Sequence, residues 1–310
     1  MPSATKFRVA FFLVAGLIAV LVVTLPFAIQ SLIDDLSRSV EGAIYPFVGT
    51  SESGRAQNSL HISIVNLDES RLTATLRVSG HRVCPSPCES GSRVILFSLG
   101  TEEGATAGMP PSANIDLTNA KSAVTESIDL PIRGHPTLYP FDVYDLWLGV
   151  GLAELGADQS VRPLSREEAS GLLAITFQEL LPREHMVPPR QQDAFSVQEE
   201  DEPIQLQGLH LLRFSRPLYE QVLAVLLVLL VAAAAAYAVF MRPLHDLVIN
   251  SGGLVLGVWG IRSILAAGTA SRTLVDLSLS LVILFLLSAI TFRAVQFLFQ
   301  RSNFRPSPEA

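Results

Sequence analysis

The sequence predicts a membrane protein of mixed class: four transmembrane helices, with an extracytoplasmic, all-β antiparallel sandwich inserted between the first and the second. Two observations predict this fold. The chain is 49% hydrophobic and only 16% charged, whereas soluble domains carry about 25% charged residues. Apolar residues also gather in one run near the N-terminus and three near the C-terminus, while the middle shows the short alternation of β-strands.

The first apolar run extends from Phe7 to Ile29 and is interrupted only by Arg8. About 20 apolar residues are needed to cross a bilayer, whereas the apolar centre of a cleaved signal peptide has about 7–15. The run therefore predicts an uncleaved N-terminal anchor over residues 1–30, with Lys6 and Arg8 on the cytoplasmic side.

The later runs predict three more helices. An even number of spans places both termini on one side of the membrane. With the N-terminus in the cytoplasm, Arg242 and the arginine-bearing tail also lie inside, as the positive-inside rule requires. We expect a multi-pass protein of the plasma membrane, with both termini cytoplasmic and the β domain outside. The expected bounds are helices over 218–242, 246–268 and 273–296, a cytoplasmic tail over 297–310 and the β domain over 31–217.

The middle of the chain is acidic. Residues 34–218 contain 25 acidic and 14 basic side chains, which gives this segment a net charge of −11. The whole chain has a net charge of −7. This balance excludes nucleic acid as a partner. Short alternating segments such as 72–78 and 144–152, separated by glycine, proline, asparagine and aspartate, predict the antiparallel sandwich. The polar, proline-bearing tract 183–203 is interpreted as a solvated loop.

The chain has two cysteines, Cys84 and Cys88, in the run Cys-Pro-Ser-Pro-Cys. In an oxidising compartment this spacing predicts a small-loop disulfide that pins a turn. Half of a metal site is the alternative, but no second cysteine pair or histidine pair completes it.

The segment Tyr139-Pro140-Phe141-Asp142 predicts a turn at the entry to a strand. Proline fixes its own φ and biases the preceding residue to extended geometry. We expect Phe141 to be buried and Asp142 to cap the turn. The alternatives are a purely structural turn and a membrane-facing loop that transmits a signal to the helices.

Two opposite charges lie in the predicted membrane segments. Arg262 and Asp276 are equidistant from Thr269, so an antiparallel hairpin places them at similar depth near the outer surface. A lone charge at mid-bilayer costs about 2.5–3.5 kcal/mol on insertion scales. We therefore predict an intramembrane ion pair, which serves either as a hairpin clamp or as part of an ion or proton path.

Other polar or small residues of the helices have simpler interpretations. Gly253, Gly257 and Gly260 form one helical stripe, which favours helix packing over a substrate pathway. Arg216 and Glu220, spaced i and i+4 at the expected outer boundary, are interpreted as an anchor in the lipid headgroups.

The sequence contains none of the common catalytic, phosphate-binding or dinucleotide-binding motifs. Its six histidines are scattered without metal-ligand spacing. We therefore expect no enzyme activity, no catalytic residues, no cofactor and no metal. The expected partners are the lipid bilayer and either further copies of the chain or another envelope protein.

Two resemblances follow from these motifs. Tyr139-Pro140-Phe141-Asp142, together with Gly260–Leu265 and Thr273–Asp276, resembles an uncharacterised family of bacterial and fungal membrane proteins known only as a domain of unknown function. That resemblance implies an architecture and no activity. The same Tyr-Pro-Phe-Asp turn is similar to the Phe-Pro-Phe-Asp turn of pentameric ligand-gated (Cys-loop) ion channels, where it lies at the base of an extracellular sandwich that precedes the membrane helices. Here one predicted helix precedes the domain and three follow it, whereas four follow it in those channels.

Three functions are consistent with these expectations. The first is a non-enzymatic membrane protein whose external sandwich binds a partner or ligand. The second is an oligomeric channel-like receptor related in shape to the pentameric channels. The third is an accessory subunit of a transporter or envelope complex.

Overall fold

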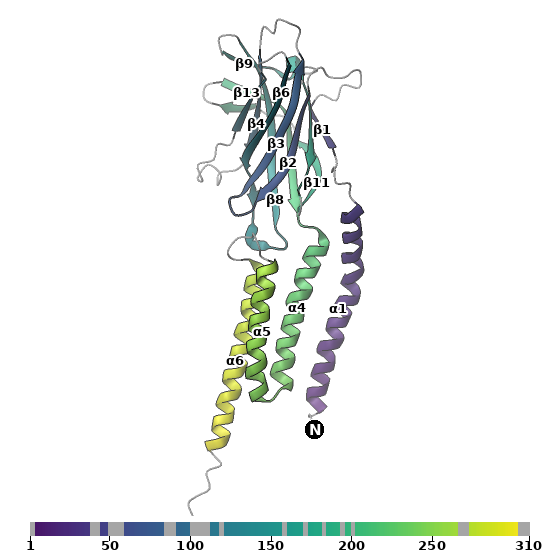
Figure 1. The fold of residues 1–310 in the computed structure, drawn as a ribbon, viewed down its shortest axis with the longest axis vertical. Coiled ribbons are helices and arrows are strands. Elements are labelled where there is room, and N and C mark those ends of the chain that lie inside the picture. The colour runs from purple at the N-terminus through teal and green to yellow at the C-terminus, as the bar shows by residue number, and fades with distance from the viewer. Residues whose placement is uncertain are drawn as a thin grey trace, which may run out of the picture. The chain divides into compact units, whose positions relative to one another are not determined.

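A computed structural model shows that the chain forms two compact units (Figure 1). The helical unit comprises Met1–Asp35, Thr137–Pro140 and Leu218–Ala310, and the β unit comprises Leu36–Pro136 and Phe141–Pro217. The structure describes residues 4–37, 44–48, 59–83, 91–99, 112–117, 121–156, 160–169, 173–181, 184–192, 196–199, 202–265 and 273–302.

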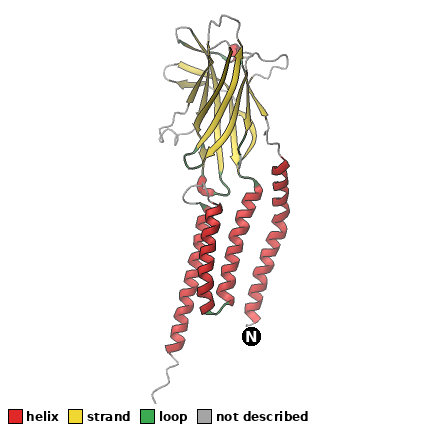
Figure 2. Cartoon of the chain, viewed as in Figure 1, coloured by secondary structure: helices red, strands yellow, loops and turns green. Residues whose placement is uncertain are grey.

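The helical unit contains four long helices within the described residues (Figure 2). Each of the four is long and apolar enough to cross a membrane, with a mean hydropathy of 2.3, 2.8, 1.3 and 2.3 in chain order. The third is the least apolar because glycines, Asn250 and Arg262 interrupt it. The helices are α1 (Ala4–Ser37), α4 (Leu218–Met241), α5 (Leu244–Leu265) and α6 (Leu274–Ser302).

Helices α4, α5 and α6 pack against one another through two apolar clusters. The alanines of α4 allow close approach, and Ala224, Ala235 and Ala238 are all buried there. At the far end of α4, Arg293 of α6 donates to the carbonyls of Val239 and Arg242, at 2.8 and 2.7 Å. A cation at this place satisfies the carbonyls that a helix C-terminus leaves free and complements its dipole.

The β unit contains two sheets, drawn in yellow in Figure 2. Every strand pair is antiparallel except β10 with β2, which is parallel. The prediction of two mostly antiparallel sheets between the first and second apolar helices is thus confirmed. The first sheet has the order β1 (Ile44–Val48), β10 (Ala174–Glu179), β2 (Ser59–Asp68), β3 (Thr73–Val83) and β6 (Lys121–Pro131). The second has the order β11 (His185–Gln192), β13 (Glu202–Ser215), β8 (Val143–Leu155), β4 (Gly91–Leu99) and β5 (Ser112–Leu117).

Shorter elements complete the unit. The strand β12 pairs with β13, and β7 and β9 pair with β8. Their bounds are β12 (Ser196–Glu199), β7 (Arg133–Gly134) and β9 (Val161–Pro163), and the unit also contains the short helix α3 (Arg166–Ala169). The short helix η1 (Pro136–Leu138) lies where the chain passes to the segment Thr137–Pro140 of the helical unit.

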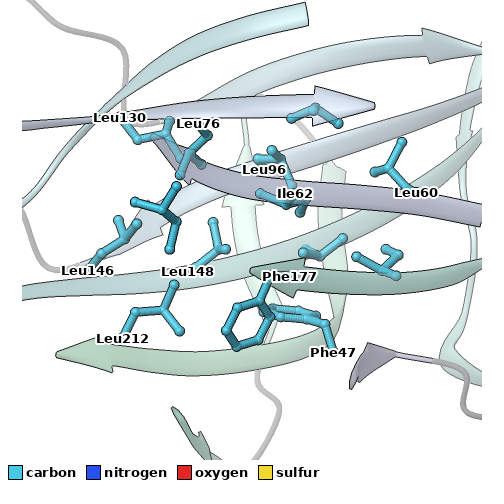
Figure 3. Close-up of a cluster of buried hydrophobic side chains, with 14 of the residues drawn as sticks. Phe47, Leu60, Ile62, Leu76, Leu96, Leu130, Leu146, Leu148, Phe177 and Leu212 are labelled. Atoms are coloured by element: carbon cyan, nitrogen blue, oxygen red, sulfur yellow. The ribbon is translucent and has the colours of Figure 1, made fainter. Parts of the chain in front are cut away.

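One apolar core lies between the two sheets (Figure 3). Because successive side chains of a strand point to opposite faces, alternate residues of each strand enter this core. The first sheet contributes Leu60, Ile62 and Leu76, and the second contributes Leu96, Leu146, Leu148 and Leu212. Phe47 of β1 and Phe177 of β10 close one side of it, with ring centroids 5.8 Å apart.

The described residues of the tract 183–203 are mostly strands, whereas a solvated loop was expected. They form β11 and β12, both paired with β13, and the first two residues of β13 itself. Prolines interrupt hydrogen bonding along a strand, so they are tolerated at sheet edges and bulges. Pro188 and Pro189 lie at the register shift between Val187 and Arg190, on the edge strand of the sheet. The prolines therefore mark an edge strand here and do not mark a loop.

Candidate functional site

A buried cluster of charged side chains occupies one end of the β unit. It comprises Glu69, Asp142, Tyr144, Glu184 and Arg216, which we call the Arg216 cluster. The members come from four chain segments, since Asp142 and Tyr144 share one, and the local structure explains how they are positioned.

Glu69 lies in the turn between β2 and β3. The carboxylate of Asp68 organises this turn by accepting hydrogen bonds from the Ser70 and Arg71 amides, both at 3.0 Å, and from the Ser70 hydroxyl at 2.6 Å. The Ser70 hydroxyl bond is the main cause that lowers the pKa of Asp68. Leu72 completes the turn with a φ of 54°, a conformation uncommon for a residue with a side chain. The turn is thus locally fixed, and it directs Glu69 into the unit.

Asp142 follows the Tyr139–Pro140 bond, which is cis. The Asp142 side chain is fully buried and accepts a hydrogen bond from the hydroxyl of Tyr144 at 2.9 Å. The ring of Tyr144 lies against Gly134 of β7, where an added Cβ would come within 2.2 Å of the ring. Only glycine leaves enough room at that position, so Gly134 allows the Tyr144 ring to lie there.

Arg216 directly follows β13, the last strand of the unit, and lies two residues before α4 begins. Its Nε donates to both carboxylate oxygens of Asp142, at 3.1 and 3.3 Å. One terminal nitrogen donates to Oε1 of Glu69, and the other lies 3.7 Å from Oε1 of Glu184. A single guanidinium therefore joins three carboxylates from three different chain segments.

The cluster is shielded from solvent and unequal in charge. The side chain of Arg216 is 3% exposed, and those of Glu69, Asp142 and Glu184 are 8%, 0% and 6% exposed. One positive and three negative groups give a formal charge of −2 when all are ionised. Oε2 of Glu69 is buried and has no hydrogen-bond partner among the described residues.

The charges shift the titration of the cluster. Burial raises the pKa of Glu69 to about 6, and the positive charge of Arg216 only partly opposes it. Asp142 and Glu184 add to the increase by repulsion. Burial alone would lower the pKa of Arg216, but the charges of Asp142 and Glu69 raise it above its ordinary value. Burial, with the charge of Asp142, also raises the pKa of Tyr144.

Other ion pairs of the β unit differ in exposure. Arg213 makes two hydrogen bonds to Asp145, at 2.8 and 3.0 Å, but its side chain is 51% exposed. The pair of Arg162 with Glu154 is also on the surface, with side chains 60% and 39% exposed. Exposed pairs contribute about 0–1 kcal/mol, so these two are of minor energetic importance.

The structure separates the four residues of the Tyr-Pro-Phe-Asp segment. Tyr139 is buried in the helical unit among Ala224, Val258 and Leu279. Phe141 is 45% exposed, so the prediction that it is buried is wrong. The aromatic residue before the proline is the buried one, while Asp142 enters the Arg216 cluster.

Arg262 and Asp276 lie together in the structure. Nε of Arg262 donates to Oδ1 of Asp276 at 2.5 Å, and Oδ2 of Asp276 accepts from the amide of Thr273. Asp276 thus caps α6 as well as pairing with Arg262. Cys84 and Cys88, the expected disulfide, lie outside the described residues.

The interpretation of Arg216 as a headgroup anchor is wrong, because its side chain is buried in the β unit. The alternation of residues along β13 could have predicted that Arg216 is buried. Leu212 and Phe214 of β13 face the core, and a period of two places residue 216 on the same face. No comparable pattern in the sequence identifies Glu69 or Glu184, because glutamate is a residue type that is usually exposed.

The glycines of α5 have no neighbours in the described part of the chain. Nothing lies within 4 Å of a Cβ added at Gly252, Gly253, Gly257 or Gly260. Within the described residues of one chain, no other element therefore packs closely against these glycines. Within the described residues, no three acidic, histidine or cysteine side chains are placed to hold a metal ion.

No protein-family model matches the chain, and no curated protein matches it.

Proposed function

We propose that the protein is a non-enzymatic integral membrane receptor. The β unit lies outside the cytoplasm, binds a partner or ligand, and passes its state to the helices through the Arg216 cluster. One observation carries this proposal: the cluster includes residues beside two of the four places where the chain passes from one unit to the other. Asp142 follows Pro140 by two residues, and Arg216 precedes Leu218 by two.

The physical argument rests on rigidity at these crossings. Arg216 ties the β2–β3 turn, the segment after Pro140 and the start of β11 to the end of β13. A movement of any one of these turns changes the environment of a buried guanidinium, which is costly. The backbone beside Arg216 and Asp142 is continuous with α4 and with the Tyr139 segment. A change in the β unit is thereby conveyed to the helical unit.

Hydrogen exchange of the full chain in lipid nanodiscs tests this coupling. Asp142→Asn removes a charge from the cluster without changing side-chain size, and Asp145→Asn does the same in an exposed pair. We expect only Asp142→Asn to accelerate exchange in residues 137–140 and in the first turn of α4. Acceleration confined to the β unit would show that the cluster stabilises its own unit and couples nothing.

The orientation is tested separately. The positive-inside distribution and four apolar helices support an external β unit with both termini in the cytoplasm. After mild reduction of intact cells, a membrane-impermeant maleimide should label Cys84 and Cys88. Labelling that requires cell lysis would place the β unit inside.

A second candidate is an oligomeric channel-like receptor, as the Tyr-Pro-Phe-Asp resemblance implies. The exposed side of α5 favours it, because Asn250 is polar and Gly253 and Gly257 allow another helix to approach closely. Native mass spectrometry of the gently extracted complex would show a homo-oligomer, and purified protein would make liposomes conductive. A stoichiometric unrelated partner would instead support an accessory subunit of an envelope complex.

A further inference from the structure

The Arg216 cluster contains an acceptor that its own charges leave unused. Oε1 of Glu69 accepts from Arg216, while Oε2 is buried and has no hydrogen-bond partner among the described residues. A buried, unpartnered carboxylate oxygen is costly, because it has lost water and gained nothing in exchange. The arrangement is therefore incomplete as it stands at full ionisation.

We propose that the Arg216 cluster is a proton-binding site, in which a proton from the external solution binds Oε2 of Glu69. The bound proton forms an O–H bond on that oxygen and reduces the formal charge of the cluster from −2 to −1. A metal cation does not suit the same place. The carboxylates surround the guanidinium at its separate nitrogens, so Arg216 already occupies the centre where a cation would be coordinated.

All charged groups that face Glu69 act in one of two directions. Arg216, which follows β13, favours the ionised carboxylate, whereas Asp142 and Glu184 favour the protonated one. Tyr144 from β8 is un-ionised and donates to Asp142. On the turn itself, Asp68 and Arg71 pair with each other at the surface, where the side chain of Arg71 is 79% exposed. Burial has the largest effect and, like the two carboxylates, favours the protonated form of Glu69. The pKa of Glu69 therefore rises from 4.5 to about 6.

Glu69 therefore changes its protonation state between about pH 5 and pH 7. With a pKa of about 6, about one molecule in ten holds the proton at pH 7 and about nine in ten hold it at pH 5. Acidification outside the cell would convert the cluster from one charge state to the other. That conversion acts on the helices only through the coupling proposed above. Its regulatory role and the external source of the proton therefore rest on the proposed function, whereas the proton site itself does not.

The closing experiment is carbon-13 NMR of the full chain in nanodiscs, labelled at the glutamate carboxyl carbons. We expect one glutamate signal to titrate near pH 6 in the wild type and to be missing in Glu69→Gln. Glu168→Gln is the matched control, since Glu168 is a surface partner of Arg162 and should leave that signal unchanged. If Glu69→Gln does not fold, Glu69→Asp removes the same glutamate signal and keeps the charge. A signal near pH 6 that persists in these variants, or no such signal in the wild type, would overturn the proposal.

Linkage gives a second readout with a defined sign. The folded pKa of Glu69 is raised, so its contribution to stability is complete below about pH 4.5 and lost as the pH rises through about 6. Relative to Glu69→Gln, the wild type should open about thirtyfold more readily at pH 7 than at pH 4 in hydrogen exchange. An equal pH dependence of the two proteins would count against the site. A titrating Glu69 with no change in α4 exchange would support the site and refute the coupling.

Discussion

Removing the guanidinium of Arg216 should strongly destabilise the β unit. Methionine replaces the apolar stem of arginine with similar volume, so Arg216→Met mainly deletes the charge and its donors. Three carboxylates, with side chains 8%, 0% and 6% exposed, then remain without their counter-ion. Breaking a buried ion pair by removing one partner costs about 3–5 kcal/mol.

The matched control is Arg213→Met, three residues earlier in the chain, near the end of β13. Arg213 also makes two hydrogen bonds to a carboxylate, but the pair is at the surface. Its loss should cost about 0–1 kcal/mol. The two substitutions remove the same number of donors and the same charge, but only Arg216→Met leaves buried acceptors behind. Their expected effects on stability are therefore very different.

Hydrogen exchange of β8 and β13 amides in the full chain measures the difference. At the limit where closing is faster than exchange, 3–5 kcal/mol corresponds to an acceleration of about a hundred- to several-thousand-fold. Arg213→Met should accelerate exchange less than about tenfold. Similar exchange in the two variants would refute the argument that burial makes the Arg216 cluster a structural centre.

Three further changes test neighbouring parts of the argument. Gly134→Ala should destabilise the β unit by about 1–3 kcal/mol, because its Cβ would meet the Tyr144 ring at 2.2 Å. Gly16→Ala is the control and should not destabilise the unit, since its Cβ would have no neighbour within 4 Å. Thermal unfolding of the two variants measures the difference. Arg262→Asp and Asp276→Arg should each lower the yield of folded protein and the double exchange should restore it; failure of that rescue would mean that the contact at 2.5 Å does not support folding. Cys84 and Cys88 should resist alkylation until reduced, and ready labelling without reductant would exclude the disulfide.

The sequence predicted the helices well because one physical quantity dominates them. Apolar length sets a membrane helix, and the expected span 218–242 differs by one residue from α4 (Leu218–Met241). The ends of α1 and α6 were less predictable. Helix α6 was expected to end at residue 296 and continues to Ser302, because hydrogen bonding and propensity extend a helix beyond its apolar part.

Strands with clean alternation were also predictable, whereas edge strands were not. The expected strand 144–152 falls within β8 (Val143–Leu155), since both faces of a central strand are constrained. Strand β11 was missed because its prolines and polar residues resemble a loop. The Arg216 cluster could not be assembled from sequence, because Glu69 and Arg216 are 147 residues apart and only the fold brings them together.

The remaining question is why the protein keeps charges at this place at all. Replacing a whole buried ionic network by apolar residues of similar volume is often neutral or stabilising by about 1–4 kcal/mol. We therefore expect the combined variant Glu69→Leu, Asp142→Leu, Glu184→Leu, Arg216→Met and Tyr144→Phe to keep a β unit at least as stable as Arg216→Met alone. In hydrogen exchange, the same variant should lose the response of α4 to external pH that we expect of the wild type. If the apolar variant kept that response, the charges would be a feature of stability alone, and transmission would have to run through another part of the chain.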